Sequence, residues 1–556
     1  MSGKREPAWL RWLGIAAMLA MLFPILAGCV AATPAAISTT APAAAPQAAP
    51  TSAPAAAPTS APAAAAGSGK VLRMARQSEP FSPFIPWELD DNPAIFIGVN
   101  VYDGLLRISA DGMGLEPGLA SKFVASPDGL TLTFTLRDNA TFSDGTPLKA
   151  EDVKASLEAV ADLTKSGKSA WSSNYTAIKE VQIADPKTIK LILTQPAPAL
   201  PSALAMFSAG IVPADLAVAS QAKDFDVTKL WKTRGTGAFY VDGWQKGDLL
   251  VLKRNPHYWK GTPALDEVDI EFVPDDNTRI LKLEGGETDV IDFVPLSQLA
   301  TVGAQPGLKA QAFTVQALSN MIINVTKKPL DDVKIRQALN YATDKDAIIK
   351  NVYFGQGKPQ NSPIPPGMYW DKDLPGYPFN LEKAKQLMKE SSAPNGFTVE
   401  MQVRSGNTEY TNIATIVKDQ WAKIGVNVNL VNLETSLVRT NYRSGNYEIM
   451  PIGYTNDMND PTEATNFMVR GNVSPFAYWT HWDDPAVDDM ITKADLEMNP
   501  TTRETMYKQI QKTFLDAAPQ IFLVYRPDTA AWQNYVEGFN IEAMDYYRFE
   551  NVKLNK

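Results

Sequence analysis

The chain has 556 residues, a formal net charge of −9, two histidines and one cysteine. A mildly acidic chain does not suggest a nucleic-acid partner, and two histidines argue against a histidine-based catalytic or metal site. A lone cysteine forms no internal disulfide, so Cys29 needs another explanation.

The first 28 residues have the pattern of a signal peptide. A basic segment precedes an apolar run at 12–26, which is too short for a comfortable membrane span of roughly 20 residues. The sequence LAGC that ends at Cys29 resembles the bacterial lipobox, in which the cysteine is acylated and becomes the new N-terminus. An ordinary signal peptide with a chance cysteine is the alternative. We expect a lipoprotein, with residues 1–28 removed and Cys29 lipidated.

Residues 29–69 predict a disordered tether. They are rich in Ala, Pro, Ser and Thr, carry no charge, and repeat themselves, since TSAPAAAP at Thr51 returns as TSAPAAAA at Thr59. Such a segment cannot bury a core. The globular part therefore begins near Lys70. No further apolar stretch is long enough to span a bilayer, so we expect a protein that is anchored rather than embedded.

The globular part alternates strands with helices. LTLTFTLR at 130–137 alternates apolar residues with threonines, which is typical of a half-buried strand. The segments 396–406, 411–425 and 426–434 predict a strand, a helix that Gly425 ends, and a second strand, which together form a βαβ unit of a parallel sheet. Further helices are predicted at these segments: 149–164, 331–344 with Asp332 as N-cap, and 380–390 with Asn380 as N-cap.

An α/β sheet of this kind binds ligands beyond the carboxyl ends of its strands. Two loops meet that description: RSGN at 404–407, and GYTNDMNDP at 453–461 after a predicted strand at 447–452. We therefore expect ligand contacts from these two loops.

Four blocks in order resemble the family 5 extracellular solute-binding proteins. They are ATFSDGTPLKAEDVKASL at 140–157, GTGAFYVDGWQKGDLLVLKRNPHYWKGTPALDEV at 235–268, INVTKKPLDDVKIRQALNYATDKDAIIKNVYFGQGKPQNSPIPP at 323–366, and IVKDQWAKIGVNVNL at 416–430. The resemblance implies an α/β, two-lobed, periplasmic-binding-protein-like (type II) fold with hinge strands and an extra subdomain. The implied division is lobe I at 70–112, 230–318 and 517–556, its subdomain at 113–229, and lobe II at 319–516.

The same resemblance implies a transport role without catalysis and without a cofactor. Such a protein captures a peptide between its lobes and delivers it to ABC permease subunits with their cytoplasmic ATPases. We expect a monomer outside the cytoplasm, in a periplasm or on an outer cell surface. An oligosaccharide or another small solute, including nickel held by a chelator, stays open as the ligand.

The loop at 453–461 resembles the family motif G-W-x-A-D-Y-x-(D/E)-P. Asp457 falls on the aspartate that pairs with the α-ammonium of a peptide, and Tyr454 falls on the cleft tryptophan. The chain departs from the motif at Asn456 and Met458. A buried ammonium must be paired, which gives one fixed carboxylate a physical reason. The alternative is that Asp457 is only a turn residue.

Each of the remaining site candidates also has a structural interpretation. Trp87, in the loop after the first strand, lines the cleft or belongs to the core. Tyr478 and Trp479 are candidates for side-chain pockets, and Arg404 for a ligand carboxylate, although an arginine there is more often structural. His257 and His481 lack metal-ligand spacing, so no metal site is predicted.

Two other classes of protein remain. A hydrolase would need a nucleophile with a base, and neither G-x-S-x-G nor HExxH occurs. An adhesive surface lipoprotein would not need the family blocks. Neither class explains the loop at 453–461.

Overall fold

The computed structural model describes residues 70–556 apart from 83, 227–233 and 472–479. Cys29, the segment 29–69, Tyr478 and Trp479 lie outside the described residues. Within the described part of the chain, no helix is long and apolar enough to cross a membrane.

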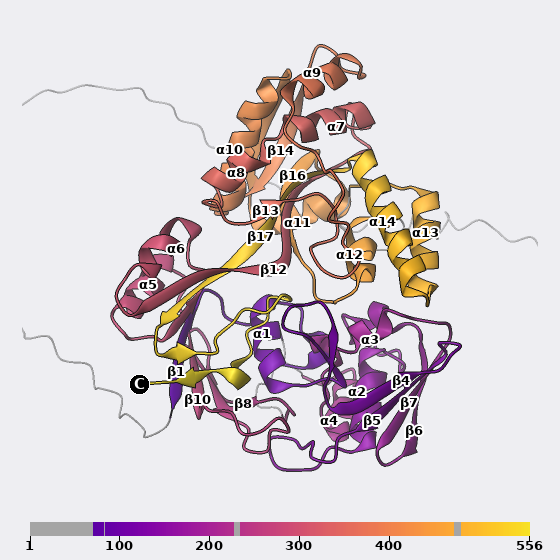
Figure 1. Cartoon of the computed structure of the whole chain (residues 1–556), viewed down its shortest axis with the longest axis vertical. Coiled ribbons are helices and arrows are strands. Elements are labelled where there is room, and N and C mark those ends of the chain that lie inside the picture. Colours follow the sequence, from indigo (N-terminus) through magenta and orange to yellow (C-terminus); the bar gives the residue numbers. More distant parts are fainter. Residues whose placement is uncertain (1–69, 83, 227–233, 472–479) are drawn as a thin grey trace, which may run out of the picture. The chain divides into compact units, whose positions relative to one another are not determined.

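The main sheet has 11 described strands. It extends through both halves of the molecule (Figure 1). Its order is β15-β14-β16-β12-β17-β11-β1-β10-β9-β8, and β13 pairs with β17. The strands are β1 (Val71–Arg76), β8 (Phe239–Gln245), β9 (Leu249–Arg254), β10 (Glu267–Phe272), β11 (Val290–Asp292), β12 (Leu308–Ile323), β13 (Lys358–Pro359), β14 (Phe397–Arg404), β15 (Val426–Leu433), β16 (Ile449–Thr455) and β17 (Gln520–Gln533).

Two long antiparallel strands, β12 and β17, join the two halves of this sheet. β17 pairs with β11 at one end, and β12 pairs with β16 at the other. Their mutual register shifts between Thr314 and Leu318, and again between Ser319 and Asn320. Irregular pairing of this kind bends a strand. Each half has its own hydrophobic core, and we call them the first lobe (the β1 side) and the second lobe (the β14 side).

The first lobe also contains a separate four-stranded antiparallel sheet, in the order β4-β5-β7-β6. Helix α2 packs on β6 and β7 (Figure 1). The elements are β4 (Ala120–Ala125), β5 (Thr131–Leu136), β6 (Ile178–Asp185), β7 (Thr188–Leu193) and α2 (Ala150–Val160). Leu132, Phe134 and Leu136 are buried, as the alternation predicts. Leu130 was expected to join them, but it precedes β5 and is exposed, because its N–H donates to Asp128 in the turn.

The βαβ unit of the second lobe is confirmed. β14 and β15 pair in parallel from Phe397 opposite Val426, and α10 connects them. The helix begins at Thr408, three residues before the prediction, because the side chain of Asn407 caps it by accepting from the N–H of Tyr410. Gly425 has a φ of 83°, a left-handed conformation that favours glycine.

Local caps fix the remaining helices of the second lobe. Asp332 and Asn380 accept N–H groups of the first turns of α7 and α9, as predicted. The helices of the main lobes are α1 (Asn92–Val101), α5 (Asp276–Glu284), α6 (Leu296–Gly303), α7 (Val333–Ala342), α8 (Lys345–Asn351), α9 (Leu381–Lys389), α10 (Thr408–Ala422), α11 (Thr435–Ser444), α12 (Pro461–Met468), α13 (Pro485–Leu496) and α14 (Pro500–Ala517). Two shorter ones, α3 (Leu200–Ala203) and α4 (Ala214–Ser220), belong to the first lobe.

β16 runs further than the sequence indicated. The predicted strand ended at residue 452, yet pairing with β12 continues to Thr455 opposite Ala317. The loop that was expected at 453–461 therefore begins only at Asn456. This placement sets the position of the candidate site.

Candidate functional site

The short loop between β16 and α12 is fixed at both ends. At its start, the amide of Asn456 donates to Gln316 Oε1 at 2.7 Å and to the carbonyl of Met458 at 2.6 Å. At its end, Asp460 caps α12 by accepting from the N–H of Thr462. A loop with both ends tied presents Asp457 at a defined point.

An ion pair reinforces the end of this loop. Both carboxylate oxygens of Asp460 accept from Arg503, at 2.6 and 2.8 Å, and both residues are about 3% exposed. A bidentate pair of this kind fixes orientation as well as distance. Asp460 is therefore committed to holding the loop in place.

Asp457 lines a hollow between the two lobes. The second lobe contributes Thr455 and Asp457, and the first lobe contributes Arg76 and Phe96 together with the segment 544–547. The hollow has about 340 Å³ of unfilled space, its open mouth included. The enclosed part of the hollow measures only about 20 Å³, which is room for about one water molecule.

The carboxylate of Asp457 has no positive partner. No described residue forms an ion pair with it, and burial alone raises its pKa to about 7. The neighbouring Glu463 accepts the backbone N–H of Asp457 at 2.9 Å, and burial together with the charge of Asp457 raises the pKa of Glu463 as well. The half-buried carboxyl group of Asp457 and the buried one of Glu463 therefore lie close together, and neither forms an ion pair with a described residue.

The first lobe closes over this loop. Ser202 Oγ donates to the carbonyl of Asn459 at 3.0 Å, the amide of Asn459 donates to the carbonyl of Gly114 at 3.3 Å, and the hydroxyl of Tyr546 lies 3.4 Å from the carbonyl of Asp457. Met458 is 1% exposed and packs into the core of the first lobe. These contacts account for the partial burial of Asp457.

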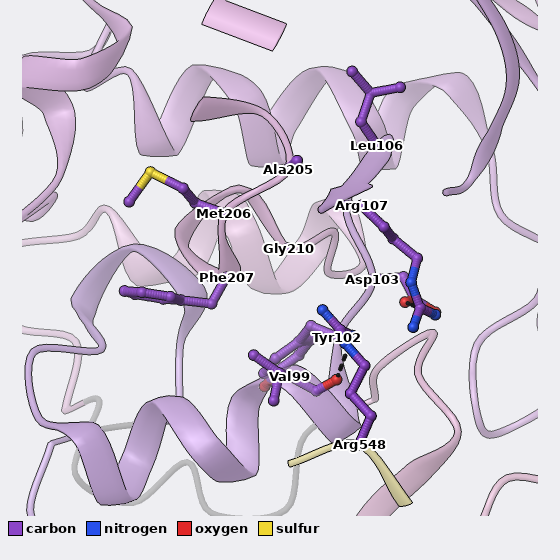
Figure 2. A pocket seen from close by; sticks show the side chains of 11 residues that line it. Val99, Tyr102, Asp103, Leu106, Arg107, Ala205, Met206, Phe207, Gly210 and Arg548 are labelled. Atoms are coloured by element: carbon purple, nitrogen blue, oxygen red, sulfur yellow. Dashed lines mark hydrogen bonds and ion pairs between the residues drawn. The ribbon is translucent and has the colours of Figure 1, made fainter. Parts of the chain in front are cut away.

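A second hollow in the first lobe has no unmatched charge (Figure 2). Arg107 pairs with Asp103 at 3.3 Å and with Glu550 at 2.8 Å. Arg548 donates to the carbonyl of Val99 at 3.1 Å, the contact drawn in Figure 2, and also pairs with Glu542. The charges that line this hollow are already paired within the protein, which distinguishes it from the hollow at Asp457.

Of the other predicted site residues, the three that the structure describes do not line the hollow at Asp457. Tyr454 is buried in the core of the second lobe, and its hydroxyl donates to Asn456 Oδ1 at 3.0 Å. Trp87 is fully buried in the first-lobe core, although its indole N–H has no hydrogen-bond partner. Arg404 is the last residue of β14 and its guanidinium lies over the ring of Tyr410 at 5.6 Å. Among the described residues, no group of His, Cys, Asp and Glu is arranged to hold a metal ion.

The sequence interpretation missed Arg76, Glu463 and Asp545. Arg76 closes β1, the first strand, so the rule that ligands lie beyond strand ends could have indicated it. Glu463 lies six residues after Asp457 in the first turn of α12, and helix geometry brings it back toward the loop. Asp545 follows no regular element, and no sequence signal identified it.

A profile described as bacterial extracellular solute-binding proteins, family 5 middle, matches residues 114–475. The dipeptide-binding protein of Escherichia coli (strain K12) is 29% identical over 493 residues, which cover 83% of this chain and 92% of that protein.

Two solved structures are also similar. A periplasmic binding protein from Helicobacter pylori, in complex with the peptide STSA, has a TM-score of 0.77 and 26% identity, covering 88% of this chain and 98% of that one. HbpA2 from Haemophilus parasuis has a TM-score of 0.76 and 30% identity, covering 87% and 100%. The expected two-lobed α/β fold of periplasmic binding proteins is confirmed. The chain belongs to family 5 of the bacterial extracellular solute-binding proteins.

Proposed function

We propose that this protein captures short peptides between its lobes and delivers them to an ABC permease. The observation that carries the proposal is the carboxylate of Asp457, which lies half-buried at the hollow between the lobes and has no ion pair with a described residue. The α-ammonium of a peptide would supply that charge. One fixed carboxylate sets the direction of the peptide, while side chains further along need no specific partner.

The wider assignment extends the sequence expectations. Cys29 carries the lipid anchor, residues 29–69 form the tether, and the mature protein works as a monomer outside the cytoplasm without catalysing a reaction. Lobe I comprises 70–112, 230–318 and 517–556, with 113–229 as its subdomain, and lobe II comprises 319–516. The strand order supports this division, since β12 and β17 connect the halves of the main sheet.

The other predicted residues take supporting roles. Tyr454 holds Asn456 through its hydroxyl and so positions the loop rather than the ligand. Arg404, Tyr478 and Trp479 are proposed to contact the distal part of a peptide. Trp87 supports the first-lobe core.

Calorimetric titration of the purified protein with dipeptides, tripeptides and small oligosaccharides tests the ligand class. We expect peptides to bind, and Asp457→Ala to remove that binding. An N-acetylated form of the same peptide is the matched ligand control, because it lacks the ammonium and should bind no better to the wild type than to the variant. If oligosaccharides bind the wild type and also bind Asp457→Ala, the ligand is a sugar and the peptide assignment is wrong.

The anchor needs a separate experiment. Cell fractionation of a Cys29→Ser variant should move the protein from the membrane to the soluble extracytoplasmic fraction. A variant that remains with the membrane would contradict lipidation at Cys29. This test leaves the ligand assignment untouched.

A further inference from the structure

A second carboxyl group lines the same hollow as Asp457. Asp545 lies in a tight turn with a φ of 60°, its N–H donates to the carbonyl of Glu542 at 2.8 Å, and the N–H of Glu542 donates to the carbonyl of Tyr546 at 2.9 Å. This turn presents the carboxyl group of Asp545 to the hollow.

The ion pairs that surround Asp545 leave its carboxyl group without a cation of its own. Two arginines are nearby, and each has a carboxylate of its own: Arg76 pairs with Asp292 at 2.6 Å, and Arg526 pairs with Asp528. Asp528 also faces Asp545, and the two acidic side chains interact directly. Burial and Asp528 together raise the pKa of Asp545 well above its ordinary value.

Several polar atoms around the hollow are buried without a partner. They include Asp545 Oδ1, Asp528 Oδ2, the hydroxyl of Tyr547 and Arg76 Nη1. Tyr547 is 2% and Arg76 3% exposed. Buried polar groups are normally hydrogen-bonded, so a cluster of this kind offers bonding positions to a ligand group or to ordered water. Three of the four atoms can accept a hydrogen bond, which suits an ammonium or a guanidinium.

Part of the lining of the hollow is apolar. Ile95, Phe96 and Met544 line the hollow and are at most 6% exposed. A long aliphatic side chain with a terminal cation matches such a lining, because its methylene groups bury apolar surface while its charged end reaches a polar group.

We propose that Asp545 binds a second positive charge, so that the preferred peptides carry a lysine, ornithine or arginine as their first residue. This inference rests on the proposed function, in which Asp457 binds the α-ammonium. A second cation in the same hollow would then come from the side chain of the first residue of the peptide, the residue that carries the α-ammonium. When it binds, Asp545 releases its proton to solvent and forms the ion pair.

The test compares two dipeptides, Lys-Ala and norleucine-Ala, which differ by the terminal ammonium of the first side chain. Calorimetry on the full-length protein should give a Kd for Lys-Ala that is about 10- to 100-fold lower, as expected for a buried charge pair. Titration in two buffers of different ionisation enthalpy should show about one more proton released with Lys-Ala.

Asp545→Asn should bring the ratio of the two Kd values close to one. Asparagine tolerates the left-handed backbone at this position, so the variant should fold. Asp489→Asn is the matched control, because Asp489 is an exposed carboxylate on α13 that pairs with Lys493; it should keep the wild-type ratio.

The outcomes separate the two proposals. Equal Kd values for both peptides in the wild type, or an Asp545→Asn variant that keeps the preference, would overturn the role of Asp545 and leave the peptide assignment intact. If neither peptide binds the wild type, or if Asp457→Asn binds both as tightly as the wild type, the proposed function fails and the inference fails with it.

Discussion

Replacing Asp457 by asparagine should stabilise the unliganded protein while weakening its binding of peptides. The two effects have one cause. A carboxylate that is buried without a counter-ion destabilises the empty protein and attracts the ammonium of a ligand. Asparagine keeps the size of the side chain and removes the charge.

The magnitude follows from the pKa. Burial raises the pKa of Asp457 from 3.8 to about 7, a difference that corresponds to about 4 kcal/mol between the charged and neutral forms. This value is an upper limit, because the mouth of the hollow admits water. Asp457 does not destabilise the folded protein below pH 3.8, because its carboxyl group is protonated in both the folded and the unfolded state. The destabilisation grows as the pH rises toward 7 and is constant above that.

Scanning calorimetry at pH 5 and pH 8 measures the effect. For a chain of this size, 4 kcal/mol corresponds to roughly 4 °C in Tm, so Asp457→Asn should raise Tm by up to that amount at pH 8 and by clearly less at pH 5. The exposed Asp489→Asn variant should leave Tm within about 1 °C at both pH values. Peptide Kd should rise at least about 30-fold in Asp457→Asn. A lower Tm at pH 8 would refute the reasoning, since it would mean that Asp457 is stabilised by a partner.

Three further outcomes are expected. Peptide Kd in the wild type should rise about tenfold for each pH unit below 7, because Asp457 must lose its proton to bind; a Kd that is flat from pH 5 to 7 would contradict this, and calorimetry measures it. Arg503→Ala should lower the free energy of unfolding in urea by about 3–5 kcal/mol, because it leaves Asp460 charged and buried. Trp87→Ala should lower it by about 3–5 kcal/mol as well, and a loss of affinity without a loss of stability would instead place Trp87 in the site.

The elements that the sequence predicts well are those with local causes. The helix α10 and its flanking strands follow from apolar periodicity, and Asp332 and Asn380 act as caps because a cap needs only the next three residues. The predicted end of β16 was wrong. The last pair of this strand, Thr455 with Ala317, joins segments that are far apart in the sequence. Periodicity does not report such pairing.

The residues of the candidate site also fall into those that a local motif predicts and those that only the fold brings together. Asp457 could be proposed from its motif, since the motif is continuous in the sequence. Arg76 and Asp545 come from opposite ends of the described chain, and only the fold brings them to one hollow. The role of Asp545 depends on these neighbours. Asp292 neutralises Arg76 and Asp528 neutralises Arg526, so Asp545 is an acidic group in excess of the basic ones.

The proposed role of Asp457 couples closure of the lobes to binding of a cation. The contacts of Ser202 and Gly114 with Asn459, and the insertion of Met458 into the first-lobe core, hold the loop against the first lobe. The same contacts remove water from Asp457, so in the empty protein closure carries the cost of an unpaired charge. A bound ammonium removes that cost only in the closed arrangement, where the carboxylate is buried. A ligand shifts a conformational equilibrium by its difference in affinity for the two states, and the unpaired carboxylate of Asp457 supplies that difference.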